Sequence, residues 1–177
     1  MDNDSDGGRD VNAPTPTIRP MTSKDWPEVR RIYAEGIATG AATFDSEIPE
    51  WDEWSAKHLA AARIVAERGG RMVGWAALMP VSPRVCYRGV AEVSVYVGDG
   101  ARGTGVGRAL LMALIDASER AGIWTLFSSI QSDNPVSVAL HEKCGFRMIG
   151  RRERLAQRNG VWQDTFNMER RSRIVGV

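Results

Sequence analysis

The sequence has little of several features that mark specialised classes of protein. Its 177 residues include only two cysteines, Cys86 and Cys144, which are too few for a disulfide framework and lack CxxC spacing. Its formal net charge is +1, from 23 basic and 22 acidic side chains, so the whole molecule projects no strong field toward nucleic acid. We therefore expect neither a metal site nor a nucleic-acid partner.

Long apolar runs are also missing. No segment approaches the ~20 apolar residues of a membrane-spanning helix, and the first residues lack the basic start and apolar core of a secretory signal. We expect a cytoplasmic protein without a membrane partner. The first stretch has too few apolar groups to offset the entropy of ordering it, so we predict a disordered leader (1–16), one folded domain (17–171) and a short tail (172–177).

Periodicity divides the domain into strands and helices in the order β, α, α, β, β, β, α, β, α, β, β. This order indicates one central sheet covered by helices, an α/β or α+β fold. The clearest strand is Val90–Val97, where period two places Glu92, Ser94 and Tyr96 on one face and apolar residues on the other.

Other segments carry local signals. A helix over Trp51–Ala61 is expected to leave His58 exposed, and two prolines make Pro80–Arg88 a loop. Gly69-Gly70 and Asn159-Gly160 predict tight hairpins.

Three further helices are expected. Thr22-x-x-Asp25 is a capping-box-like start to a helix that runs to about Thr39 and carries an apolar stripe for the core. The other two run from about Thr104 to Arg120 and from Pro135 to Lys143.

Three glycines, Gly103, Gly105 and Gly107, lie between the Val90–Val97 strand and the next predicted helix. Glycine lets the main chain approach a ligand closely, and free N–H groups at a helix start attract anions such as phosphate. Arg102 and Arg108 flank the glycines and add charge suited to a pyrophosphate. The segment is therefore a candidate anion-binding turn.

Other interpretations of the glycines compete with this one. A Walker loop requires GxxxxGK followed by Ser or Thr, and no Lys-Ser or Lys-Thr follows here. A dinucleotide fingerprint requires GxGxxG, and Leu110 stands where the third glycine should be. A turn used only for tight packing stays open on the glycines alone.

The residues around the turn resemble the acetyl-CoA signature of the GNAT superfamily of N-acetyltransferases: Gln or Arg, two variable residues, Gly, one variable residue, then Gly or Ala. Here it is Arg102-x-x-Gly105-x-Gly107, and a second signature follows as Asn134-x-x-Ser137-x-x-x-His141-Glu142-x-x-Gly145-Phe146. The resemblance spans about Thr17 to Arg170. It implies a single GNAT-like domain, with a central mixed, mostly antiparallel sheet flanked by helices, that uses acetyl-CoA as co-substrate.

Within the superfamily the chain is similar to bacterial phosphinothricin and methionine sulfone or sulfoximine acetyltransferases. The matching residues are Thr43-Phe44, Tyr87-Arg88-Gly89, Glu92 with Ser94–Val97, Leu140-His141-Glu142 and Gly160-x-Trp162-x-Asp164. Thr104 departs from the pattern, standing where Lys or Arg is common, and so does Gln131, where a related sequence can carry Glu. The terminal hairpin resembles a dimer element of this subgroup, which implies a homodimer.

The resemblance also implies how acetyl-CoA is held. The main chain of Val95–Val97 would pair with the pantetheine arm, and an amide near Ser94 or Val95 would face the thioester oxygen. Asn134 would bond the same arm, with capping of the following helix as the alternative. The expected cofactor-binding residues are Val95, Tyr96, Val97, Arg102, Gly103, Thr104, Gly105, Val106, Gly107, Arg108 and Asn134.

A substrate amine is mostly protonated at neutral pH, because an α-amino group titrates near ~8, so attack on a thioester requires a base. Glu92 suits that role on a core strand, where burial raises a carboxyl pKa; the alternative is a carboxylate that only pairs with Arg88. No Cys or Ser stands beside a base, which favours direct attack over an acyl-enzyme. His141 stands where most of the superfamily has Tyr, so the resemblance gives it protonation of the leaving thiolate or assistance to Glu92; simple packing stays open.

We expect the acceptor to be a small anionic or zwitterionic amine, because donors lie on the loop just upstream of Glu92. The expected substrate-binding residues are Phe44, Ser82, Arg84, Tyr87, Arg88, Val93, Ser94 and Gln131. The alternatives are acetylation of a protein N-terminus or an aminoglycoside, or a non-catalytic module that binds acyl-CoA. The presence of Glu92 and Asn134 favours an enzyme.

Overall fold

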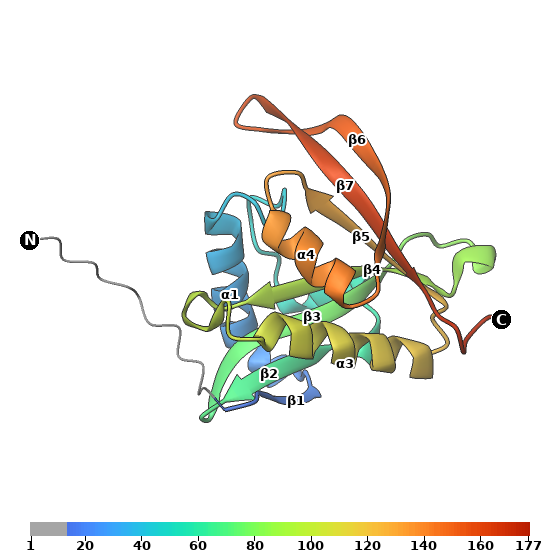
Figure 1. Cartoon of the computed structure of the whole chain (residues 1–177). Helices are drawn as coiled ribbons and strands as arrows, with labels where there is room; N and C mark the ends of the chain where they lie inside the picture. The colour runs from blue at the N-terminus through green and yellow to red at the C-terminus, as the bar shows by residue number, and fades with distance from the viewer. Residues whose placement is uncertain (1–13) are drawn as a thin grey trace, which may run out of the picture.

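The computed structural model describes residues 14–177, so the predicted leader lies almost entirely outside the described residues (Figure 1). The helices and strands follow the predicted order. They are β1 (Thr17–Pro20), α1 (Trp26–Ala38), α2 (Trp51–Lys57), β2 (Ile64–Arg68), β3 (Arg71–Pro80), β4 (Val90–Val97), α3 (Val106–Arg120), β5 (Thr125–Gln131), α4 (Pro135–Lys143), β6 (Arg147–Arg158) and β7 (Val161–Arg171).

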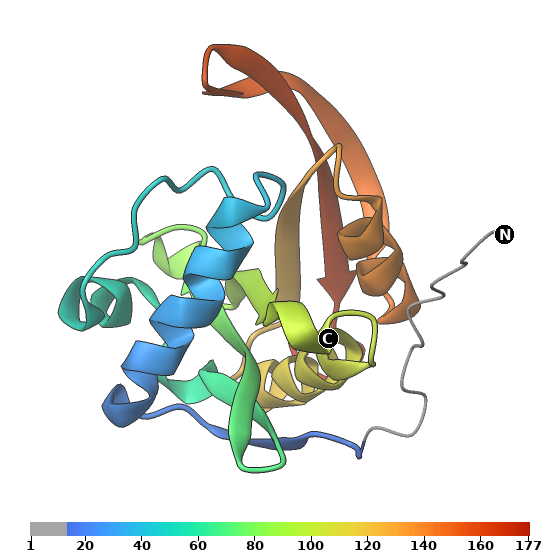
Figure 2. The same ribbon diagram turned by 90° about the vertical axis from the view of Figure 1, so that its left-hand side faces the viewer.

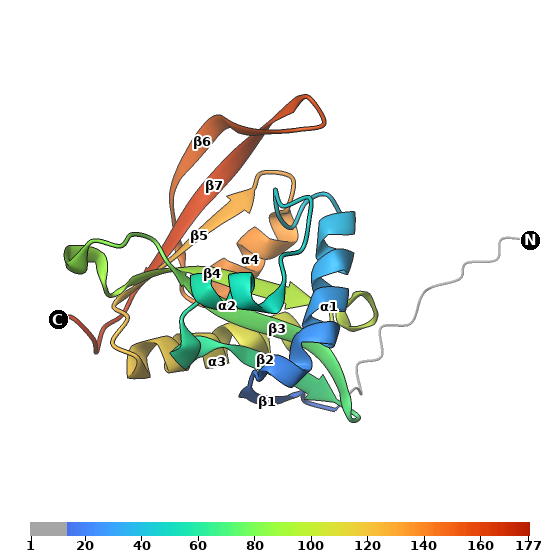
Figure 3. The ribbon, with the colours of Figure 1, turned by 180° about the vertical axis from the view of Figure 1, so that it is seen from behind.

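The strands form one seven-stranded sheet in the order β1-β2-β3-β4-β5-β7-β6. Within residues 14–177, the β4–β5 pair is parallel and the other strand pairs are antiparallel. The prediction of a single domain with a mixed, mostly antiparallel sheet is therefore confirmed. Helices α3 and α4 lie on the face toward the viewer in Figure 1, and α1 and α2 cover the opposite face, seen in Figure 3.

Each face of the sheet has its own apolar core. On the α3 side, Ala91 and Val93 of β4 pack with the buried face of α3, and Val95 and Val97 border that cluster. On the α1 side, Tyr96 packs against a second cluster that includes the predicted stripe of α1. The alternation of β4 thus divides its side chains as the sequence predicted.

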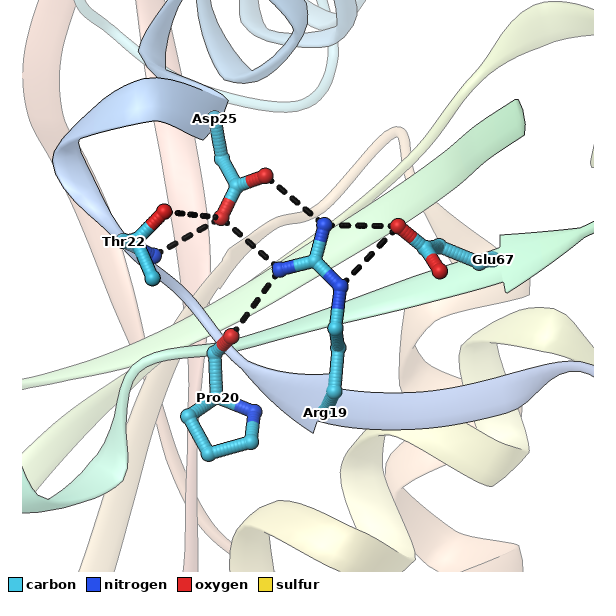
Figure 4. A network of polar contacts seen from close by, with 5 residues as sticks. All are labelled: Arg19, Pro20, Thr22, Asp25 and Glu67. Atoms are coloured by element: carbon cyan, nitrogen blue, oxygen red, sulfur yellow. Dashed lines mark hydrogen bonds and ion pairs between the residues drawn. The ribbon is translucent and has the colours of Figure 1, made fainter. Parts of the chain in front are cut away.

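A polar network anchors the start of α1 to the edge of the sheet (Figure 4). The main-chain N–H of Thr22 donates to the Asp25 carboxylate over 2.7 Å, which completes the predicted capping arrangement. Arg19 of β1 donates two hydrogen bonds to Asp25, at 2.7 and 2.8 Å, and two to Glu67 of β2. One guanidinium therefore joins the first two strands to the first helix.

Two predicted details are wrong. Helix α2 ends at Lys57, so His58 is not an exposed helical residue: it is half-buried beyond the helix, and its ring stacks on Trp54 at 4.0 Å. Helix α3 begins at Val106 rather than near Thr104, because Gly105 has a left-handed φ of 86° that a helix cannot contain.

The terminal hairpin is longer than its neighbours and extends away from the body of the molecule (Figure 2). Asn159 and Gly160 form its turn with φ values of 50° and 77°, the pair of positive angles that a tight two-residue hairpin requires. The hairpin predicted at Asn159-Gly160 is confirmed.

Candidate active site

The central feature of the site is a split in the sheet. β4 and β5 are paired only from Val90↔Thr125 to Glu92↔Phe127, and beyond that point they separate. β3 continues to pair with the other edge of β4 as far as Val97. The edge of β4 that faces the split therefore has main-chain groups free to pair with an extended ligand.

A cleft of about 760 Å³ occupies the split. It brings together six of the predicted site residues from β4 and the β5–α4 region, namely Glu92, Val93, Ser94, Gln131, Asn134 and His141. Val95, Tyr96 and Phe44 also line it. Segments that are far apart in sequence therefore share one hollow.

The glycine turn stands at the far end of β4. Gly103 and Gly105 have φ values of 75° and 86°, and a side chain added at either would meet no atom within 4 Å. The space over these two glycines is open, and the first N–H groups of α3 follow directly after Gly105. This turn fits an anionic group such as the pyrophosphate of coenzyme A.

The two arginines beside the glycines differ. Arg102 pairs with Asp99 at 2.7 Å, and its Nε donates to the Val97 carbonyl over 3.2 Å. Arg108 is exposed on the first turn of α3 and forms no ion pair within the described part of the chain. Arg108 is thus the freer cation at this helix start.

Glu92 lies at the last paired position of β4, where the split opens. Burial raises the pKa of its carboxyl above the ordinary value. Among residues 14–177 it forms no ion pair, so the alternative pairing with Arg88 is not present; Arg88 instead lies over the Trp124 ring at 5.4 Å. A half-buried carboxylate without a cation partner is suited to accept a proton.

His141 is buried on α4, with its ring edge-on to Phe146. Its Nδ1 lies 2.8 Å from the Ser137 carbonyl, which can only accept, so Nδ1 carries the proton. Burial lowers the pKa of the imidazole, which favours the neutral ring and leaves a lone pair on Nε2. That Nε2 atom is buried and has no partner in the described structure, so this tautomer can accept a proton but not donate one from Nε2.

Asn134 caps α4, because its Oδ1 accepts from the Ser137 N–H over 3.1 Å. Its Nδ2 donates to the Ala41 carbonyl over 3.2 Å. The side chain therefore joins the start of α4 to the loop after α1, across one end of the cleft.

The loop between α1 and α2 supplies a polar group that the sequence analysis missed. The Asp45 carboxylate accepts hydrogen bonds from the hydroxyls of Tyr33 and Thr43, the latter over 3.0 Å, and all three residues line the cleft. Burial is the main cause that raises the pKa of Tyr33. The spacing Thr43-x-Asp45 was the available signal, since the Thr43 hydroxyl also accepts from the Asp45 N–H.

Gln131 ends β5 and is buried. Its Oε1 accepts from Arg158 Nη1 over 2.8 Å, whereas its Nε2 is buried without a partner in the part of the chain that the structure describes. Arg158 belongs to the terminal hairpin. The hairpin thus reaches the edge of the cleft through this contact.

Four of the predicted substrate-binding residues, Ser82, Arg84, Tyr87 and Arg88, do not line the cleft. They lie on the loop between β3 and β4, where the Arg84 guanidinium sits 5.6 Å from the centre of the Tyr87 ring. The charged residues that do line the cleft are mostly acidic: Asp45, Glu47, Glu53 and Glu92, against Lys57. Lys57 is itself paired with Glu53 at 2.7 Å.

No helix within 14–177 is long and apolar enough to cross a membrane. Over the same range, no group of three or more His, Cys, Asp or Glu side chains is placed to hold a metal ion.

A sheet split between two parallel strands, with an open glycine turn at one end and a carboxylate where the strands part, suits an enzyme whose co-substrate is extended and anionic, as acetyl-CoA is. Comparison with known proteins agrees. The chain matches the Acetyltransferase (GNAT) family over residues 23–146 and belongs to that family.

Its relatives include small-molecule acetyltransferases. It is 36% identical over 161 residues to phosphinothricin N-acetyltransferase from Alcaligenes faecalis, covering 87% of this chain and 81% of the relative. It is 29% identical over 160 residues to L-methionine sulfoximine/L-methionine sulfone acetyltransferase from Pseudomonas aeruginosa, covering 86% and 92%. Among solved structures, a GNAT phosphinothricin acetyltransferase from Sinorhizobium meliloti in complex with acetyl-CoA is similar, with a TM-score of 0.81, 29% identity and 89% of each chain covered.

Proposed function

We propose that this protein transfers an acetyl group from acetyl-CoA to the amino group of a small amino-acid-like substrate, of the phosphinothricin, methionine sulfone or methionine sulfoximine type. The observation that carries the proposal is the position of Glu92, a half-buried carboxylate where β4 and β5 separate. The activities for which the relatives are named support the substrate type.

In this proposal, β4 and the glycine turn beyond the cleft bind different parts of acetyl-CoA. The free edge of β4 from Val95 to Val97 pairs with the pantetheine arm, and the turn from Gly103 to Arg108 holds the pyrophosphate. Acetyl-CoA supplies the thioester carbonyl. An N–H near Ser94 or Val95 stabilises the negative charge that develops on its oxygen.

Proton transfer falls to the side chains. Glu92 takes a proton from the substrate ammonium, directly or through one water. Attack is direct, because the Ser137 hydroxyl beside His141 lies 3.5 Å from the protonated Nδ1 and not at the basic Nε2. His141 is neutral and has a free lone pair on Nε2. It therefore assists Glu92 as a second proton acceptor and does not protonate the leaving thiolate from Nε2.

The acidic lining of the cleft supports a second acceptor class. Four carboxylates and one paired lysine favour an amine that carries additional positive charge, such as an aminoglycoside, over an anionic amine. Arg84 and Arg88 lie outside this cleft, so a role in binding an anionic acceptor would require the cleft of a second copy.

A homodimer is therefore part of the proposal. The terminal hairpin leaves Val161 and Trp162 60% and 54% exposed, and apolar side chains of this size are common at subunit contacts. A cytoplasmic location is also proposed, because it is where acetyl-CoA is available and because Cys86 and Cys144 are free thiols.

The test is a turnover assay on the purified chain with acetyl-CoA and a panel of amines. The panel contains free amino acids, phosphinothricin, methionine sulfone and sulfoximine, an aminoglycoside and a peptide with a free N-terminus. Thiol release and mass spectrometry of the acetylated product should select the amino-acid analogues. Preference for the aminoglycoside would support the second acceptor class, and binding of acetyl-CoA without turnover on any amine would refute an enzyme acting on these classes.

A further inference from the structure

A contact from the end of β2, two strands away from β4 in the sheet, holds the glycine turn in place. Arg68, the last residue of β2, donates from Nη1 to the Thr104 hydroxyl over 2.9 Å and from Nη2 to the Thr104 carbonyl over 3.3 Å. The Thr104 hydroxyl in turn donates to the Ala101 carbonyl over 2.7 Å. Thr104 lies between Gly103 and Gly105, the two glycines with left-handed φ. Arg68, which is outside the turn, holds both its hydroxyl and its carbonyl.

Within the described residues, no carboxylate neutralises the positive charge of the Arg68 guanidinium. Within residues 14–177, Arg68 forms no ion pair with a carboxylate, and its Nε is buried without a partner. A half-buried cation that bonds only a hydroxyl and a carbonyl keeps its positive potential for a nearby anion.

We infer that Arg68 is a positioning residue for coenzyme A. It holds the turn from Gly103 to Gly107 in the conformation that presents its amides, and it adds positive charge beside them. Thr104 carries no charge of its own, so Arg68 places a cation at this point of the turn from a distant strand. The inference rests on the proposed location of the pyrophosphate.

Two thioesters of different length test it. S-acetylpantetheine has the reacting group and the arm of acetyl-CoA but lacks the pyrophosphate, so it does not need the turn. For Arg68→Met, KM for acetyl-CoA should rise about tenfold, the usual effect of losing one charge-assisted contact, whereas KM for S-acetylpantetheine and kcat with either should stay at the wild-type values.

Two further variants separate a positioning role of Arg68 from a general effect of positive charge. Arg71 lies opposite Arg68 in the hairpin register and is exposed, and the hydrogen bonds to Thr104 come from Arg68 instead. Arg71→Met therefore removes one positive charge, as Arg68→Met does, and should leave KM for acetyl-CoA and for S-acetylpantetheine unchanged. Thr104→Val removes the hydroxyl that Arg68 bonds. If the two residues act together, Arg68→Met with Thr104→Val should cost less than the product of the single effects.

The outcomes are distinct. If wild type gives equal KM values with the two thioesters, the placement of the pyrophosphate and this inference both fail; if wild type releases no thiol from acetyl-CoA with any amine, the proposed function fails with them. If wild type prefers acetyl-CoA and Arg68→Met changes both thioesters equally, or neither, only the role of Arg68 is overturned. Thermal unfolding of each variant shows whether it is folded, and Thr104→Val decides the matter should Arg68→Met unfold.

Discussion

The two walls of the cleft are built in different ways. The wall proposed to bind acetyl-CoA is mainly one continuous stretch of β4 from Glu92 to Tyr96, and the chain runs on from it, beyond the cleft, through the glycine turn to Arg108 on α3. The opposite wall combines the loop after α1, the end of β5 and part of the terminal hairpin, with His58 beyond α2. Its residues are more than a hundred positions apart at the extremes.

This difference separates a fixed function from a variable one. A continuous wall keeps its geometry through local strand pairing. A wall assembled from loops and a hairpin can change its side chains without moving the β4 backbone. The relatives agree, since proteins of this one family carry names with different acceptors.

The largest expected effect comes from Glu92, where the two walls meet. Glu92→Gln keeps the size and removes the base, so kcat at neutral pH should fall by roughly 10²–10⁴-fold while the affinity for acetyl-CoA stays constant. Asp116→Asn, the same kind of change at an exposed position of α3, is the control. Wild-type turnover by Glu92→Gln at pH 7 would remove Glu92 from the mechanism and leave His141 as the next candidate.

The same residue sets a pH dependence. Because burial raises the pKa of Glu92, the wild-type rate should decline on the acid side at a pH above the carboxyl's ordinary 4.5, as the base becomes protonated. Glu92→Gln should lack this acid limb, and its deficit should narrow toward about pH 9, where more of the amine is already deprotonated. Profiles of kcat/KM for both proteins check this, and an acid limb retained by the variant would contradict it.

The next effect concerns the glycine turn that follows the continuous wall. Gly105 has a φ of 86°, so Gly105→Ala imposes a left-handed alanine that costs ~1–2 kcal/mol, and relaxation of the turn should weaken acetyl-CoA binding about tenfold. Gly122, with a φ of 78° and equally open space, lies at the other end of α3. Calorimetry should therefore find that Gly122→Ala loses similar stability but binds acetyl-CoA like wild type. Equal affinities for the two variants would mean that the turn does not hold the co-substrate.

A smaller effect is expected from the assembled wall. Gln131→Glu adds a negative charge beside Arg158, so KM should rise about fivefold for an anionic amine and fall for a cationic one, with KM for acetyl-CoA unchanged. Gln157→Glu makes the same change at an exposed position of β6 and serves as the control. A change in KM for acetyl-CoA instead would show that the two walls do not act separately.

The same division explains what the sequence could predict. β4 and α4 have their predicted bounds, because period two and a proline-led helix with an asparagine cap are local signals. The half-buried position of His58, the bonds of Asp45 to Tyr33, and Arg68 at Thr104 depend on segments brought together by folding. Sequence proximity suggested Ser82 and Arg84 as cleft residues, but the loop that carries them extends away from it.

The smallest expected effect touches neither wall and separates stability from activity. Hydrogen bonds from Arg19 are the largest cause that lowers the pKa of Asp25 from 3.8 to about 2, so the folded state holds the ionised carboxylate more tightly than the unfolded chain does. This stabilisation is fully present above about pH 4 and is lost as the pH falls through about 2.

Because the Arg19 side chain is 35% exposed, Arg19→Met should lower the free energy of unfolding at pH 7 by only ~1 kcal/mol, with kcat and both KM values unchanged. Arg30→Met breaks a more exposed pair with Glu50 and should cost less. Urea unfolding at several pH values measures the gap between wild type and Arg19→Met, which should close between about pH 4 and pH 2. A gap that stayed constant over that interval would show that the guanidinium stabilises the sheet edge by packing rather than through the Asp25 carboxylate.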